Sequence, residues 1–160
     1  MNDGVFEFSG PGFSPLGDKG RFVLPAKFRK TLKDSNSGGD KIVYLDKHAF
    51  FPCLIGFGEA RKRDIVAEVR ADAQTPMERE LALLQANSFI DAPFDESGRF
   101  VLPRPLMDLV GITGAVYFHG AGPTFTIWDP ETLLAQDNPA FATAQAHCRS
   151  LMASAKERRK

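Results

Sequence analysis

A six-residue sequence, Gly-Arg-Phe-Val-Leu-Pro, occurs twice in the chain, at Gly20–Pro25 and again at Gly98–Pro103. Each copy is followed by an amphipathic stretch that ends in polar or glycine residues, and then by two short apolar segments in the same order. Self-similarity of this kind indicates that one supersecondary unit has been duplicated. The sequence therefore predicts two similar halves.

Within each unit, the Arg-Phe-Val-Leu segment predicts a strand, because it is short, apolar and entered from a glycine turn. The proline that follows ends the strand and suits the first turn of a helix, which predicts short helices over 26–33 and 104–110. A hairpin then follows in each unit, with strands predicted over 42–45, 54–57, 115–118 and 125–128. In the second hairpin, His119–Pro123 predicts an exposed turn.

Two further stretches, 59–73 and 76–88, carry apolar residues at helical spacing and predict helices that link the units. Asp129 and Pro130 predict another helix start, and the alanine-rich tail from Asn138 to about Ala155 is also expected to be helical. The predicted fold class is α+β. We expect one compact unit in which residues 1–75 form the first half with a linking helix and residues 76–160 form the second half with the tail.

The charges of the whole chain balance, with 20 Lys and Arg against 20 Asp and Glu in 160 residues. This balance argues against a uniformly basic surface that coats nucleic acid without specificity. The two cysteines give no disulfide framework, and the most apolar stretch, 49–57, is too short to span a bilayer. We therefore expect a cytoplasmic protein with no membrane partner, in which any anion-binding site is a local patch.

One segment departs from the balance, because residues 18–33 contain six cations and one carboxylate, Asp18. The cations are Lys19, Arg21, Lys27, Arg29, Lys30 and Lys33. The matching segment of the second copy, 95–108, is slightly acidic. Since phosphate neutralisation supplies most non-specific affinity for nucleic acid, the first copy is the better candidate for phosphate contacts. A solvated helix face explains Lys30 and Lys33 equally well.

Arg21 and Arg99 each follow the glycine of a tight turn and begin a strand. A guanidinium projected from such a turn can contact guanine through two hydrogen bonds in the major groove, which admits a two-stranded β-ribbon. Alternatively, each arginine pairs with a nearby carboxylate, such as Asp95 four residues before Arg99, and fixes the turn. The Asp95 and Arg99 pair is compatible with both roles.

The sequence shows no recognisable set of catalytic residues. Residues 12–17 resemble the start of a phosphate-binding loop but lack the Lys and Ser or Thr that must follow. Neither His48 with Cys53 nor His147 with Cys148 has the spacing of a zinc site or a third catalytic partner, and free cysteines are commonly buried in cores. We therefore expect no enzymatic activity, no metal and no cofactor.

Several motifs, taken in order, resemble the MraZ family of bacterial transcriptional regulators over about residues 5–145. The motifs are Lys19-Gly20-Arg21, Pro25-Ala26-Lys27-Phe28-Arg29, Pro52-Cys53-Leu54, Pro76-Met77-Glu78-Arg79, Asp95-Glu96-Ser97-Gly98-Arg99 and Ile127-Trp128-Asp129. The resemblance implies tandem, pseudo-symmetric β-barrel halves of the AbrB-like swapped-hairpin type, with short helices.

The resemblance also implies a ring-shaped homo-oligomer of eight or twelve subunits that binds guanine-rich direct repeats in double-stranded DNA. Members of this family usually repress the division and cell-wall gene cluster, which implies a nucleoid-associated protein. The family's motif in each half is an aspartate, three residues and an arginine. Asp95 and Arg99 match it, whereas Gly17 stands at the aspartate position of the first copy and Asp18 follows it.

Combining the resemblance with the charge pattern gives a hypothesis for each candidate residue. The residues expected to contact DNA are Lys19, Arg21, Lys27, Arg29 and Arg99. Those expected to support the two turns are Asp18, Gly20, Asp95 and Gly98. The alternative hypothesis is a ring-forming scaffold or partner-binding protein whose basic face meets an acidic protein, without sequence-specific recognition of DNA.

Overall fold

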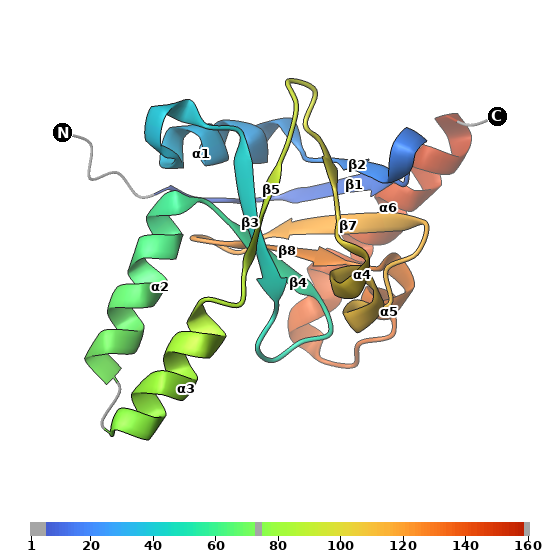
Figure 1. Cartoon of the computed structure of the whole chain (residues 1–160). Helices are drawn as coiled ribbons and strands as arrows, with labels where there is room; N and C mark the ends of the chain where they lie inside the picture. The colour runs from blue at the N-terminus through green and yellow to red at the C-terminus, as the bar shows by residue number, and fades with distance from the viewer. Residues whose placement is uncertain (1–5, 73–74, 159–160) are drawn as a thin grey trace.

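The computed structural model describes residues 6–72 and 75–158 and has the expected α+β fold (Figure 1). The first half contains β1 (Pro11–Pro15), β2 (Arg21–Val23), α1 (Ala26–Ser35), β3 (Ile42–Lys47), β4 (Leu54–Phe57) and α2 (Glu59–Asp72). The second half contains α3 (Pro76–Ala86), β5 (Ile90–Pro93), β6 (Arg99–Val101), α4 (Arg104–Val110), β7 (Ala115–Gly120), β8 (Phe125–Trp128), α5 (Pro130–Leu134) and α6 (Ala142–Arg158). Short 3₁₀ turns lie at Asp18–Gly20, Ser37–Gly39 and Pro139–Phe141.

Six strands form one antiparallel sheet in the order β1-β7-β8-β4-β3-β5, and β2 pairs with β6 as a separate two-stranded ribbon. Within the described residues the sheet stays open, because its outer strands β1 and β5 do not pair with each other. The described residues thus form no closed barrel, and their antiparallel sheets with short helices confirm the predicted α+β fold class.

Strand pairs between the two halves are related by an approximate two-fold axis. In the ribbon, Phe22 lies opposite Phe100, Arg21 opposite Val101 and Val23 opposite Arg99. In the sheet, β4 and β8 pair in the same symmetric manner. The strand β1 also pairs with β7, and β5 pairs with β3, so the halves interlock. The sequence repeat thus appears as a symmetry of the fold.

The predicted helices are confirmed, and local signals explain where they begin. Prolines precede α1 and α4 directly. At the start of α5, the Asp129 carboxylate accepts a hydrogen bond of 3.1 Å from the Thr132 N–H, as expected of an N-cap. The helices α2, α3 and α6 occupy the linking and tail segments, with α6 beginning after a 3₁₀ turn.

Two strands, β1 and β5, are not predicted by the sequence, although each directly precedes one of the repeated turns. Proline disfavours strands because it cannot donate a hydrogen bond to a neighbour, and both segments contain it. Both strands lie at the edges of the sheet, where proline is tolerated. Edge position is a tertiary property that a local pattern does not reveal.

The prediction that His119 lies in an exposed turn is wrong. The strand β7 continues to Gly120, and the half-buried His119 ring lies 2.8 Å from the Tyr117 hydroxyl, with which it shares a hydrogen bond. Burial is the main cause that lowers the pKa of His119, and the nearby His147 adds to it.

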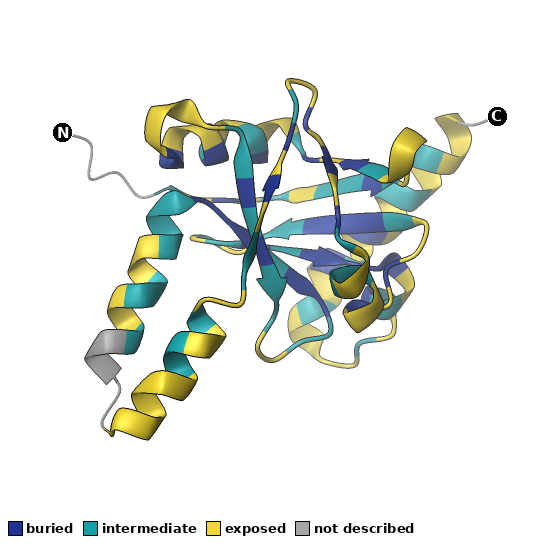
Figure 2. Ribbon diagram, viewed as in Figure 1, coloured by how far each residue is buried: buried dark blue, intermediate teal, exposed yellow. Residues whose placement is uncertain are grey.

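The main apolar core lies between the sheet, the ribbon and α1 (Figure 2). It includes the edge-on and tilted rings of Phe8, Phe28, Phe118 and Phe125. A smaller cluster on the other face of the sheet packs Tyr117 and Trp128 against α5 and α6. Both faces of the sheet thus carry an apolar cluster, and the ribbon packs on the larger one through Phe22 and Phe100.

Helices α2 and α3 form a hairpin that projects from this body (Figure 1). The outer face of α3 exposes Met77, Leu81 and Leu84, whose exposed fractions are 69%, 56% and 71%. In the described part of the chain, no helix combines the length and apolar character needed to cross a bilayer.

Candidate nucleic-acid interface

The β2–β6 ribbon has two different faces: the inward face is apolar, and the outward face carries both arginine and valine side chains. Side chains alternate along a strand, so Phe22 and Phe100 point to the core, where their exposed fractions are 0% and 1%. Arg21 and Arg99 therefore share the outward face, although they belong to different halves of the chain. The fold thus brings together the two arginines that the sequence places in separate copies of the repeat.

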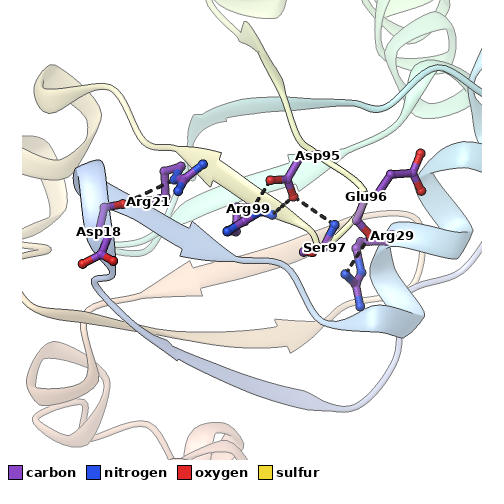
Figure 3. A network of polar contacts seen from close by, with 7 residues as sticks. All are labelled: Asp18, Arg21, Arg29, Asp95, Glu96, Ser97 and Arg99. Atoms are coloured by element: carbon purple, nitrogen blue, oxygen red, sulfur yellow. Dashed lines mark hydrogen bonds and ion pairs between the residues drawn. The ribbon is translucent and has the colours of Figure 1, made fainter.

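The turn that leads into β6 holds its arginine with a carboxylate (Figure 3). The Asp95 Oδ1 atom accepts hydrogen bonds of 2.9 Å from the N–H groups of both Ser97 and Arg99. The other oxygen, Oδ2, accepts a hydrogen bond of 2.8 Å from the Arg99 Nε–H group. One side chain thereby fixes both the backbone of the turn and the direction of the guanidinium.

These contacts favour the ionised carboxylate. The Arg99 backbone N–H is the main group that lowers the pKa of Asp95, and the Arg99 guanidinium also contributes. Gly98 completes the turn with φ +86°, where a side chain would lie 2.9 Å from the Leu24 carbonyl oxygen. This turn therefore requires a glycine for two reasons, its backbone conformation and the close approach of a neighbouring chain segment.

The turn that leads into β2 has the same backbone hydrogen bonds without the carboxylate. Gly17 N–H donates to the Arg21 carbonyl at 2.8 Å, as Asp95 N–H donates to the Arg99 carbonyl at 3.0 Å. Gly17 is thus the structural counterpart of Asp95, and it has no side chain with which to hold Arg21. Glycine at the aspartate position of the motif therefore leaves Arg21 without the carboxylate that orients Arg99.

Asp18 takes part in the first turn through its backbone. Its carbonyl oxygen accepts a hydrogen bond of 3.3 Å from Arg21 Nε–H, while its carboxylate makes no hydrogen bond or ion pair within residues 6–72 and 75–158 (Figure 3). Lys19 is exposed and has φ 61°, followed by Gly20 at φ +69°. The guanidinium of Arg21 is therefore less constrained than that of Arg99.

Two predicted DNA-contacting residues on α1 point in different directions. Lys27 and Arg29 flank the buried Phe28, so the helical periodicity directs them to opposite sides. Arg29 reaches the second turn, where its Nη1 donates to the Glu96 carbonyl oxygen at 3.3 Å. Lys27 lies beside Gly10 instead. Arg29 thus lies near the ribbon, whereas Lys27 is separate from the two turns.

Two cations of the basic segment, Lys30 and Lys33, lie near carboxylates. Lys30 forms an ion pair of 3.1 Å with Asp34 one helical turn later. Glu96 pairs with Lys41, which lowers the pKa of Glu96, and the charge of Lys33 lowers it further. Lys41 was missed by sequence reasoning, since it precedes β3 and meets the turn only in the folded chain. The local positive charge is smaller than the sequence alone indicates.

The other reactive side chains fit structural roles. Burial raises the pKa of the Cys53 thiol to about 12 and that of Cys148 to about 11, so both are protonated and unreactive at neutral pH. Among the described residues, no three His, Cys, Asp or Glu side chains are grouped so that they could hold a metal ion. The ribbon and its turns are therefore the strongest candidate site.

Comparison with known proteins adds an independent line of evidence. No family model matches the chain. The transcriptional regulator MraZ of Gluconobacter oxydans is 32% identical over 130 residues, covering 79% of this chain and 78% of the relative. The MraZ protein of Ruegeria pomeroyi is 33% identical over 135 residues, covering 78% of each. That of Pseudomonas syringae pv. tomato is 32% identical over 139 residues, covering 86% of this chain and 90% of the relative. The chain belongs to the MraZ family of transcriptional regulators.

Proposed function

We propose that this protein regulates transcription by binding double-stranded DNA with the outward face of the β2–β6 ribbon. The observation that carries the proposal is the antiparallel register that places Arg21 and Arg99 on one exposed face. A two-stranded ribbon fits the major groove, and arginine is the side chain that contacts guanine most often there. Regulation of transcription is also the activity for which the relatives are named.

The proposed contacts divide into base and phosphate contacts. Arg21 contacts bases, because its guanidinium extends from the turn with a single weak backbone partner. Arg99 contacts DNA while Asp95 orients it. Lys19 and Arg29 bind phosphates on either side of the ribbon, and Lys27 extends the phosphate contacts beyond it. Gly20 and Gly98 maintain the turns from which the arginines project.

Assembly into a closed ring of eight or twelve copies is part of the proposal. A single ribbon with a few cations binds DNA weakly, whereas linked ribbons on one duplex gain affinity through their effective concentration. The exposed apolar side chains of α3, Met77, Leu81 and Leu84, offer a surface for contacts between subunits. Repeated ribbons would engage guanine-rich direct repeats, in the manner that the family resemblance implies.

The proposed target is the promoter of the division and cell-wall gene cluster, where bound rings would repress transcription. This assignment rests on the family resemblance and gives the protein a place in the cytoplasm, on the nucleoid. It requires no cofactor and no membrane partner.

Fluorescence anisotropy tests the proposal with a duplex that carries three or four guanine-rich direct repeats and with a scrambled duplex, each over a series of salt concentrations. The wild-type protein should prefer the repeats. Arg21→Ala should remove the preference, whereas Lys27→Ala should weaken binding to both duplexes alike and reduce the salt slope by about one unit.

Arg63→Ala is the matched control, since this arginine on α2 is exposed and distant from the ribbon (Figure 1). It should leave both affinities unchanged. Full preference for the repeats in Arg21→Ala would contradict the base-contacting role. Equal, weak and strongly salt-dependent binding of both duplexes by the wild type would instead favour a scaffold that binds an acidic protein.

A further inference from the structure

We infer that Val23 and Val101 recognise thymine, each by packing its methyl groups against the C5-methyl group of a thymine next to a guanine. The inference rests on the proposed function, because it requires the ribbon to lie in the major groove. It adds an apolar component of specificity to the outward face that carries the two arginines.

The first supporting observation is the exposure of both valines. Val23 and Val101 are 42% and 53% exposed on the outward face, while the residues between them and the arginines point to the core. A strand favours β-branched side chains, but threonine satisfies that preference without exposing a second methyl group to water. Two half-exposed valines at equivalent positions of both copies therefore indicate a contact with an apolar group.

The second observation is the register of the ribbon. Val101 lies directly opposite Arg21, and Val23 lies directly opposite Arg99. Side chains that face each other across an antiparallel pair have Cβ atoms about 5 Å apart, so the arginine and the valine of each pair can contact neighbouring bases. Each arginine is therefore paired with one valine, and the two pairs are related by the approximate two-fold axis of the ribbon.

The chemistry of the major groove matches this pairing. Thymine presents a methyl group there, and contacts between that group and apolar side chains distinguish it from cytosine. A groove of about 310 Å³ beside the ribbon is lined by Arg21, Arg99 and Val101, so polar and apolar groups are available on one surface. Excluding water around a valine would also strengthen the hydrogen bonds of the arginine opposite.

The experiment begins by selecting preferred duplexes from a random library with the wild-type protein. Each thymine of the selected duplex is then replaced singly by deoxyuridine, which removes only the methyl group, and affinity is measured by anisotropy. At the thymine next to a guanine, the replacement should weaken wild-type binding about threefold to fourfold, the effect of one buried methyl group. In Val101→Ala or Val23→Ala, the corresponding replacement should change affinity less than twofold.

Val101→Thr and Leu109→Ala are the control variants. Threonine preserves strand propensity and shape and keeps one methyl group that can contact thymine, so Val101→Thr should retain most of the wild-type effect of deoxyuridine. Leu109 on α4 is 60% exposed and lies outside the ribbon, so its variant should respond to deoxyuridine as the wild type does.

The inference is supported if the effect of deoxyuridine on affinity is lost in Val23→Ala and Val101→Ala and kept in the controls. Equal effects of deoxyuridine in the wild type and in all variants would overturn it, as would selected duplexes without thymine beside guanine. If those duplexes still depend on Arg21, the proposed function survives and only the role of the valines fails. If selection yields no preferred duplex, both fail.

Discussion

The two turns that lead into the ribbon share their backbone hydrogen bonds and differ at the position that Gly17 and Asp95 occupy. Asp95 ties the second turn to Arg99 through three hydrogen bonds, whereas Gly17 leaves Arg21 with one long contact to a carbonyl oxygen. The backbone hydrogen bonds of the turns are otherwise equivalent. The first turn forms without a carboxylate, whereas in the second turn Asp95 both holds two backbone N–H groups and orients Arg99.

The difference gives the ribbon one arginine that is held in place and one that is free to move. A preformed arginine loses less conformational freedom when it binds, and a free arginine can adapt to more than one arrangement of bases. The duplicated fold therefore provides one arginine of each kind, Arg99 and Arg21.

Replacing the turn glycines should affect stability unequally. Gly98→Ala imposes a positive φ on alanine and also a contact of 2.9 Å with the Leu24 carbonyl, so it should lower the free energy of unfolding by about 2–4 kcal/mol. Gly20→Ala imposes the strained φ but meets nothing within 4 Å, and should cost about 1–2 kcal/mol. Urea denaturation measures both values, and equal losses would show that the second turn is not the more crowded one.

Installing the missing carboxylate should make the turns alike. Gly17 has φ −101° and ψ −167°, an extended conformation that any residue adopts, and an added Cβ would lie 3.3 Å from the Arg21 carbonyl oxygen. With a shift of a few tenths of an ångström, Gly17→Asp can place a carboxylate where Asp95 lies in the other turn. In the wild type, NMR should show slower exchange of the Nε–H with water for Arg99 than for Arg21. In Gly17→Asp, the exchange at Arg21 should slow several-fold.

Arg99 serves as the internal reference in that experiment, and Gly17→Asn separates the acceptor from the charge. An unchanged rate at Arg21 in a folded Gly17→Asp protein would mean that a carboxylate at this position is not enough to orient Arg21.

Acid should weaken the second turn only, and this is the smallest expected effect. Because the folded pKa of Asp95 lies below its ordinary value of 3.8, the unfolded chain binds this proton more readily. The stability that the ionised Asp95 provides is complete above that value and is lost as the pH falls through the folded pKa. The wild type should therefore lose more stability than Asp95→Asn between about pH 4 and pH 2.

Urea midpoints measured across that pH range test this prediction. Other carboxylates with lowered pKa values, Glu59 and Glu96, remain in both proteins, so the difference between the two curves isolates Asp95. Parallel curves would mean that the hydrogen bonds of Asp95 do not depend on its charge.

The sequence predicts those features that depend on local signals. The repeat, the helices that start after Pro25 and Pro103, and the missing aspartate at Gly17 are all visible in the linear chain and confirmed in the fold. The strands that contain prolines were missed because their tolerance depends on edge position. The division of the chain into residues 1–75 and 76–160 stays a prediction.

The candidate site was only partly predictable for a related reason. The residues around the turns could be named, but the pairing of Arg21 with Val101 across the ribbon, and of Lys41 with Glu96, joins segments far apart in sequence. Charge counting along the chain did not separate a phosphate contact from a solvated helix face for Lys30 and Lys33. Lys30 pairs with Asp34 on the same helix, and only the folded chain brings Glu96 near Lys33.

The interlocked halves have a consequence for how the protein is made on the ribosome. The strand β2 finds its partner only after β6 has emerged, and β1 must wait for β7. Until then the apolar side chains of the first half lack the segments that cover them, and closing such long loops is slow. The nascent chain therefore completes its ribbon late in translation, and a product truncated before residue 99 cannot form the β2–β6 pair at all.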